Sequence, residues 1–351
     1  MSTDIRQLLR LAIELDASDI LLSVGSPAGL RVDGRLQPVD MPRLEASELE
    51  AAMDVLTDDA QRERWRRGRH VDFGISVAGR RLRGAAAWTR GQPALALRLL
   101  PAEIPRPGAL GVPNVLVDLL ERPWGLLIAT GPAGQGKTTT LASLIDVINR
   151  QRMQHVVTVE DPIEYVHEPV RSIVDQLEVG HDTPSFGEAL RHVLRHNPDV
   201  IVVGEIRDRE TLEAALTIAE TGHLVMTTMH ANDSVQAIDR MVSLFPADRR
   251  DYVLGQLGMV MAAIVNQRLV PGLEGGRVLA SEVLMNSHAV ANLVREGRTA
   301  QLHSSLETER HRGSKSLNTA LTELVNAGKI HIAEARRHVN PLETDHLPRP
   351  S

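Results

Sequence analysis

The sequence predicts an α/β protein of two domains, and three features of the chain lead to this fold class. The pattern GPAGQGKTTT at residues 131–140 stands between an apolar segment and a run with helical spacing, the strand–loop–helix context of a phosphate-binding loop. Several β-branched, nearly continuous apolar segments suit a parallel sheet buried on both faces. A proline-rich stretch separates them from an N-terminal part with hairpin signals. We therefore expect an α+β N-terminal domain, then a parallel-sheet α/β domain that carries the loop.

The N-terminal domain is expected over residues 1–100. Apolar residues recur on one helical face over residues 4–16, and a second helix is predicted at residues 45–56. Residues 71–101 are typical of a strand meander, so that an antiparallel sheet with flanking helices results. The predicted turns between strands are at Asp33-Gly34, near Ala78-Gly79 and near Gly91-Gln92.

A linker and a second domain follow. Residues 101–114 carry four prolines, a composition in which helix and strand are both disfavoured. The second domain is expected over residues 115–340, and its part beyond Val270 should be mostly helical. The tail at residues 341–351 is expected to be disordered. The predicted parallel strands are at residues 125–130, 155–161, 199–205 and 223–229.

Composition narrows the class of protein. A net charge of −6 gives no overall attraction to nucleic acid or anionic lipid, and 2% aromatic residues offer few surfaces for stacking bases. The chain has no cysteine, which excludes disulfides and thiolate metal sites. Without a signal-peptide core or a long apolar run, we expect a cytoplasmic protein with at most peripheral membrane association. The basic run at residues 61–70 is either a solvated helix end or a contact with a membrane or an acidic partner.

The phosphate loop is the strongest functional signal. Its glycines leave backbone N–H groups exposed, and these groups form an anion receptor together with the start of the following helix. Lys137 is expected to reach the β- and γ-phosphates, and the Thr138 hydroxyl to bind Mg²⁺. We therefore predict that the chain binds a nucleoside triphosphate. The residues expected to touch it are Gly131, Pro132, Ala133, Gly134, Gln135, Gly136, Lys137, Thr138 and Thr139.

Polar side chains at three later strand ends indicate that the nucleotide is cleaved. Because ligands of open α/β sheets bind at the carboxyl ends of the strands, Glu164, Glu205 and His230 should converge on the loop. Glu205 is the best candidate to orient an attacking water. Gly204 stands where an acid usually helps to hold Mg²⁺, so Thr138 and water would be the main ligands, with Glu164 as a supporting partner. His230 either senses the γ-phosphate or is a satisfied structural histidine.

Arginines of the N-terminal domain are a second source of positive charge. Arg81 and Arg83 alternate along a predicted strand and therefore share one face of the sheet. Arg98 on the next strand should lie close to them. Such a row is either a solvated sheet face or a cluster that approaches the phosphates of a neighbouring nucleotide, as in other hydrolases that use arginine to speed cleavage.

Six motifs in order make the chain similar to a known family. It resembles the type IV pilus retraction ATPases, the PilT-like members of the secretion ATPase superfamily. Two positions depart from the family pattern: Ala291 stands where arginine is usual, and the histidine that generally follows the aspartate of the first motif is absent. The motifs are at residues 17–36, 131–140 (Walker A), 159–165 (Asp box), 203–208 (atypical Walker B), 221–233 (His box) and 289–297 (C-terminal motif).

The resemblance implies a PAS-like first domain, a RecA-like second domain and a ring-shaped homohexamer that uses ATP and Mg²⁺. It implies that Glu205 is the catalytic glutamate, supported by Glu164, and that His223 and His230 lie near the nucleotide. It also places one or more of the three first-domain arginines, Arg81, Arg83 and Arg98, against the nucleotide. The expected partners are an inner-membrane pilus platform protein and a paralogous pilus ATPase, at the cytoplasmic face of the inner membrane.

Retraction of pili is the favoured function, because relatives that extend pili or drive type II secretion commonly carry a longer N-terminus and a tetracysteine zinc module. An accessory PilU-like ATPase and an assembly or type II secretion ATPase are the alternatives within the family. A regulatory scaffold that binds ATP with little turnover is an alternative of another class, although Lys137, Thr138 and Glu205 are intact. DNA translocation is disfavoured by the acidic charge balance.

Overall fold

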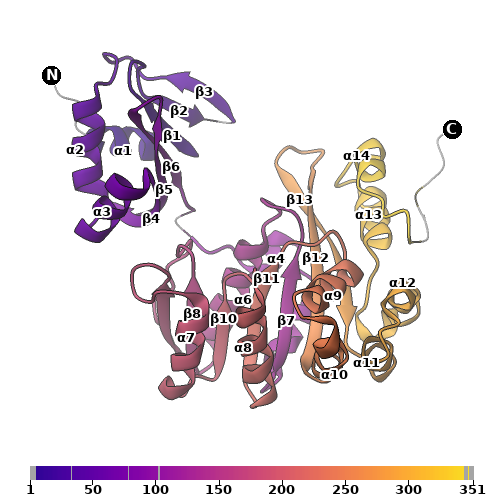
Figure 1. The fold of residues 1–351 in the computed structure, drawn as a ribbon. Coiled ribbons are helices and arrows are strands. Elements are labelled where there is room, and N and C mark those ends of the chain that lie inside the picture. The colour runs from indigo at the N-terminus through magenta and orange to yellow at the C-terminus, as the bar shows by residue number, and fades with distance from the viewer. Residues whose placement is uncertain (1–4, 33, 78, 102, 344–346, 348–351) are drawn as a thin grey trace. The chain divides into compact units, whose positions relative to one another are not determined.

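The computed structural model describes residues 5–32, 34–77, 79–101, 103–343 and 347 (Figure 1). The chain divides into two compact units. The first comprises Met1–Glu103 together with Pro162–Val166, and the second comprises Ile104–Asp161 and His167–Ser351. A short segment of the later chain therefore belongs to the first unit.

An antiparallel six-stranded sheet with accompanying helices forms the first unit, which confirms the predicted α+β class. The strand order is β3-β2-β1-β6-β5-β4. Helices and sheet share one apolar core, to which α1 contributes Leu9, α2 contributes Met53, and the sheet contributes Ile20, Phe73 and Leu97. The elements are α1 (Ile5–Glu14), β1 (Asp19–Ser23), β2 (Gly29–Val32), β3 (Arg35–Pro38), α2 (Ala46–Leu56), α3 (Asp59–Gly68), β4 (His70–Val77), β5 (Arg80–Thr89) and β6 (Gln92–Leu99).

The turns of this sheet follow local backbone chemistry. β2 and β3 pair as an antiparallel hairpin, as predicted. Asp33 and Ala78, which were named in two of the predicted turns, lie outside the described residues. The last turn is one residue earlier than predicted, because Arg90 and Gly91 both have positive φ (54° and 73°) and β6 already begins at Gln92. Positive φ at both central residues gives the turn twist that matches two paired strands.

The second unit is built on a seven-stranded sheet in the order β13-β12-β7-β11-β10-β8-β9. All neighbouring strands are parallel except β12 and β13, which form an antiparallel pair. The carboxyl ends of the parallel strands therefore lie along one edge of the sheet. The strands are β7 (Gly125–Thr130), β8 (His155–Glu160), β9 (Ile173–Glu178), β10 (Val200–Val203), β11 (Leu224–Met229), β12 (Met261–Pro271) and β13 (Arg277–Met285).

Helices cover both faces of this sheet, because alternate strand residues enter two separate apolar clusters. Ile128 and Val203 pack with α7, α8, α9 and α10 in one cluster, and Leu127 and Val202 pack with α5 and α6 in the other. Within the described chain, no helix combines the length and the apolar character that crossing a bilayer requires. The helices are α4 (Pro107–Leu110), α5 (Asn114–Asp118), α6 (Lys137–Gln151), α7 (Phe186–Val193), α8 (Arg209–Glu220), α9 (Ser234–Ser243), α10 (Arg250–Val260), α11 (His288–Arg295), α12 (Leu302–Thr308), α13 (Leu317–Asn326) and α14 (Ile332–Arg337).

Three details differ from the sequence-based expectation. The chain beyond Val270 is not mostly helical at first, since β13 pairs with β12 along its whole length. The proline-rich linker contains the short helix α4, whose first residue is Pro107, a position where the missing N–H of proline costs nothing. The expected disordered tail is packed where it is described: Glu343 accepts the backbone N–H of Asn318 (2.9 Å), and Leu347 joins an apolar cluster with Leu317.

Candidate active site

The loop after β7 has the backbone that a close anion receptor needs. It spans residues 131–136 and leads directly into α6. Gly131 (φ 143°), Gly134 (φ 73°) and Gly136 (φ 80°) adopt conformations that residues with a side chain rarely take. A Cβ on Gly131 would also lie 2.7 Å from the carbonyl oxygen of Gln267. The glycines therefore allow the backbone to fold tightly at the start of a helix, where N–H groups attract anions.

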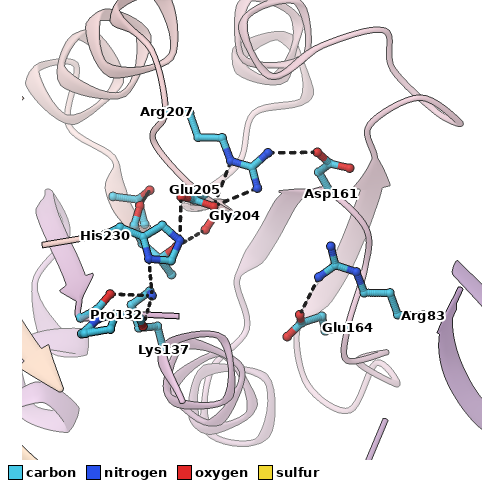
Figure 2. Close-up of polar contacts among 12 residues, drawn as sticks. Arg83, Pro132, Lys137, Asp161, Glu164, Gly204, Glu205, Arg207 and His230 are labelled. Atoms are coloured by element: carbon cyan, nitrogen blue, oxygen red, sulfur yellow. Dashed lines mark hydrogen bonds and ion pairs between the residues drawn. The ribbon is translucent and has the colours of Figure 1, made fainter. Parts of the chain in front are cut away.

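Lys137 lies at the centre of this loop (Figure 2). The residue is only 8% exposed. Its Nζ donates hydrogen bonds to the carbonyl oxygens of Gly131 (2.8 Å) and Pro132 (2.9 Å) and lies 3.3 Å from Nδ1 of His230. An ammonium group can only donate, so Nδ1 of this histidine must be the accepting ring nitrogen.

Glu205 is held from two sides (Figure 2). Its Oε1 lies 3.2 Å from Nε2 of His230, so a neutral imidazole with its proton on Nε2 satisfies both the lysine and the glutamate. Its Oε2 lies 3.0 Å from the guanidinium of Arg207, which is 3.6 Å from Oδ2 of Asp161. Lys137, His230, Glu205, Arg207 and Asp161 thus form one continuous polar network beside the phosphate loop. The Glu205 carboxylate is thus held in place by His230 and Arg207, and its role in orienting an attacking water stays a prediction.

Acidic side chains nearby do not form a metal centre on their own. The position of Gly204 is crowded, because a Cβ there would lie 3.2 Å from a backbone carbonyl of β8. Glu160 accepts hydrogen bonds from Thr158 (2.7 Å) and Gln176 (3.1 Å). These bonds give Glu160 a structural role at the end of its strand. Among the described residues, no group of three or more His, Cys, Asp or Glu side chains could hold a metal ion. A Mg²⁺ ion here would therefore depend on the Thr138 hydroxyl, phosphate oxygens and water, which suits the preference of Mg²⁺ for keeping several waters.

Within one chain, His223 lies away from this loop, and its expected place near a nucleotide stays a prediction. It precedes β11, and its Nδ1 lies 3.1 Å from Oγ1 of Thr221. β11 runs parallel to β7 with Leu224 opposite Gly125, so His223 lies at the edge of the sheet opposite to the loop. A six-residue strand separates its two ends by roughly 20 Å. His223 and His230 share one motif, but they stand at opposite ends of its strand.

Glu164 and the arginines Arg81 and Arg83 meet within the first unit. Arg83 lies 3.7 Å from Oε1 of Glu164 (Figure 2). Arg81 Nε donates to the carbonyl oxygen of Ile163 (3.1 Å). The segment Pro162–Val166 is thereby bonded to β5. The support of Glu205 by Glu164, and any contact of these arginines with nucleotide, stay predictions.

Arg98 faces Arg83 in the pairing of β5 with β6, and it has a carboxylate partner on the next strand. Its Nε donates to Oδ1 of Asp19 (3.0 Å). Although burial raises the pKa of Asp19, hydrogen bonds from Ser18 and Arg98 and the charges of Arg98 and Arg31 outweigh it and lower this pKa. Within the first unit, Arg98 therefore links β6 to β1 through its contact with Asp19.

β12 supplies polar residues that the sequence-based reasoning missed. Asn266 donates from Nδ2 to Oγ1 of Thr130 (2.8 Å), immediately before the loop, and Gln267 donates to Oγ1 of Thr140 (2.7 Å) in α6. Arg268 donates to the carbonyl oxygen of Asn232 (2.6 Å). These bonds hold the strand before the loop and the helix after it in place. The available signal was the run NQR inside the apolar stretch 262–270, since buried polar residues need partners.

Comparison with known proteins confirms the resemblance. Residues 2–276 match the family described as type II/IV secretion system protein. The chain is 39% identical over 334 residues to the type IV pilus retraction ATPase PilT of Pseudomonas aeruginosa, which covers 95% of this chain and 97% of that protein. It is 37% identical over 339 residues to the type IV pilus ATPase PilU of the same organism, covering 96% of this chain and 89% of that one.

The fold also has a solved counterpart. A crystal structure of the pilus retraction motor PilT with bound ADP matches with a TM-score of 0.89 and 42% identity, covering 97% of this chain and 98% of that chain. The predicted fold class, an N-terminal α+β domain and a RecA-like ATPase domain, is confirmed by this match.

Proposed function

Because the chain belongs to the family of type II/IV secretion system proteins, we propose that it is a P-loop ATPase that powers the retraction of type IV pili. The observation that carries this proposal is 39% identity, over nearly the whole chain, to a protein named as a pilus retraction ATPase. The network of Lys137, His230 and Glu205 beside the phosphate loop supports the chemistry, in which ATP and water yield ADP and phosphate.

Each side chain of the network has a role that its charge suits. Lys137 exchanges its bonds to Gly131 and Pro132 for β- and γ-phosphate oxygens. Glu205, held by Arg207, orients the water that attacks the γ-phosphate. The Thr138 hydroxyl would hold Mg²⁺, which compensates phosphate charge when bound.

The loss of the Lys137 contact would free Nδ1 of His230. The ring would then be free to respond to the γ-phosphate while its Nε2 stays beside Glu205. The histidine would then link the presence of the γ-phosphate to the position of the carboxylate that orients water.

The working form is proposed to be a homohexameric ring at the cytoplasmic face of the inner membrane, in contact with a pilus platform protein. Arg81, Arg83 and Arg98 of the first unit would approach nucleotide in the ring, and ATP would then favour a closed arrangement of the units. A ligand shifts such an equilibrium only by its different affinities for the two states, and these arginines supply that difference. An accessory role beside a second motor is the alternative, supported by 37% identity to the pilus ATPase PilU.

Two substitutions should separate nucleotide binding from cleavage. Lys137→Ala removes a ground-state contact with phosphate, so both ATP affinity and turnover should be lost. Glu205→Gln mainly affects the water, so ATP should still bind while kcat falls by at least about 10²-fold. Glu210→Gln is the matched control, because Glu210 pairs with Arg191 outside the network. Equal loss of nucleotide affinity in the Lys137 and Glu205 variants would overturn these roles, and negligible turnover of the unchanged chain would favour the regulatory scaffold.

Removing the gene in the host tests the biological function. Cells that keep many pili but do not twitch support a retraction motor, and cells without pili indicate an assembly motor. Complementation with Glu205→Gln should fail if hydrolysis drives retraction. Normal pilus number and normal twitching after removal would contradict the proposal.

A further inference from the structure

A cavity of the second unit lies at the edge of the sheet opposite to the phosphate loop. It has a volume of about 540 Å³, within the range of specific binding pockets. Trp124, which lines it, immediately precedes β7, while the phosphate loop follows the other end of that strand. β12 begins and β13 ends at this same edge. The side chains that matter here are Arg122, Trp124, Met259, Ala291, Arg295 and Arg312.

Positive charge lines the cavity, and two of its three arginines have no acidic partner among the described residues. Arg122, Arg295 and Arg312 line it, and no Asp or Glu does so among the described residues. Arg312 pairs with Glu309 at 3.3 Å. Arg122 and Arg295 form no ion pair with any residue in the described part of the chain. Arg295 donates hydrogen bonds to the carbonyl oxygen of Ala291 (3.2 Å) and to Oδ1 of Asn292 (2.6 Å), which are both neutral acceptors. Two guanidinium groups beside a cavity, without an acidic partner in the described chain, favour an anionic occupant.

Local packing holds one of these cations in position. A Cβ on Gly258 of α10 would lie 2.7 Å from Cγ of Arg295, so the stem of this arginine rests directly on the glycine. Asn286 donates from Nδ2 to the carbonyl oxygens of Gly258 (3.1 Å) and Met261 (2.7 Å). These bonds satisfy carbonyl oxygens at the carboxyl end of α10, whose partial negative charge would otherwise repel an anion. The start of α11, capped by Ser287, lies at the same cavity and adds the positive end of a helix.

Exposed apolar side chains continue from the cavity along α10. Trp124 is 45% exposed and Met259 is 58% exposed, and both line the cavity. Tyr252, two helical turns before Met259, is 60% exposed. Tryptophan, tyrosine, methionine and arginine are enriched at protein–protein interfaces relative to the rest of a protein surface. From Tyr252 to Met259 the helix rises about 10 Å, which is longer than one small anion can cover while it also occupies the cavity.

We propose that this surface docks an acidic segment of a partner protein that also carries an apolar anchor. The anchor enters the cavity beside Ala291, Trp124 and Met259, and carboxylates of the same segment pair with Arg122 and Arg295. Ala291 leaves space for the anchor that the arginine expected from the family resemblance would fill. Because nucleotide binds at the opposite sheet edge, the partner and ATP can be held at the same time. The inference stands on this cavity and does not require the proposed pilus function.

Site-specific photo-crosslinking in the producing cell tests the proposal. A benzophenone amino acid replaces Tyr252, and the same group at Leu273 is the control, because Leu273 is 56% exposed in the turn after β12, at the far edge of the sheet. The expected result is an adduct at position 252 whose other half maps to a segment rich in Asp or Glu, with no such adduct at position 273. Arg122→Glu together with Arg295→Glu should reduce that adduct at least about tenfold, because like charges then face each other.

Charge exchange completes the test. Reversing the mapped carboxylates of the partner to lysine should restore the adduct with the doubly substituted chain. Purified Arg122→Glu/Arg295→Glu protein should keep its ATPase rate and melting temperature, which separates loss of docking from misfolding and from failure of the proposed function. An adduct only to a second copy of this chain, to a segment without acids, or at a level equal to position 273 would overturn the proposal. So would an adduct that charge reversal leaves unchanged.

Discussion

Replacing His167 with glutamine should remove a pH-dependent loss of stability from the second unit. His167 is 5% exposed, and its Nδ1 is buried without a hydrogen-bond partner in the described chain. Burial disfavours the imidazolium, and although the Asp146 carboxylate opposes this effect, the pKa of His167 falls from 6.5 to about 4. The unfolded chain therefore binds a proton at this residue more readily than the folded chain.

The sign and the size of the effect follow from this difference in pKa. Above pH 6.5 the histidine is neutral in both states and does not affect stability. As pH falls from 6.5 towards about 4, the unfolded state is protonated first, so the free energy of unfolding declines. Each pKa unit is worth about 1.4 kcal/mol, so the complete loss is about 3 kcal/mol, of which roughly 2 kcal/mol is present at pH 5.

Hydrogen–deuterium exchange of peptides from β7 and β10 measures this stability in the second unit alone. The free energy of opening should fall between pH 7.5 and pH 5 by roughly 2 kcal/mol more in the unchanged protein than in His167→Gln. His311→Gln is the control, because His311 is an exposed histidine of the same unit. If His167→Gln and the unchanged protein lose the same stability to within about 0.5 kcal/mol, burial of the imidazole does not control this pH dependence.

Two further substitutions test the packing of each unit. Glu282 is fully buried, and burial, reinforced by Glu343, raises its pKa well above the usual value despite hydrogen bonds from Ser234. The folded state therefore loses stability as pH rises above the pKa of this carboxyl in the unfolded chain. Glu282→Gln should melt at a higher temperature than the unchanged protein at pH 8 and at the same temperature at pH 4.5. A lower melting temperature of this variant at pH 8 would refute that reasoning. In the first unit, a Cβ on Gly84 would lie 2.1 Å from the ring of Phe73, so Gly84→Ala should destabilise it by about 1–3 kcal/mol in calorimetry. Gly68→Ala, with nothing within 4 Å, should not, and equal effects of the two changes would contradict the packing.

Much of the candidate site could be predicted from the sequence because it depends on local chemistry. The glycines of residues 131–136, Lys137 at the start of a helix, and acids placed after apolar strands are readable in the order of the chain. The parallel arrangement of these strands then requires Glu205 and His230 to stand at the same sheet edge as the loop. The turn between β5 and β6 was predictable to within one residue for the same reason, since φ and turn type are set by neighbouring residues.

What only the tertiary structure decided involves segments far apart in the sequence. It paired β12 with β7, so that Asn266 braces the strand before the phosphate loop. It bonded the segment Pro162–Val166 to the first unit, through Ile163 and Glu164. It also gathered Arg122 and Arg295 around one cavity. The physical reason is that a residue's spacing along the chain predicts which face of a helix or strand it occupies, whereas the partner of that face depends on which buried surfaces fit together in three dimensions.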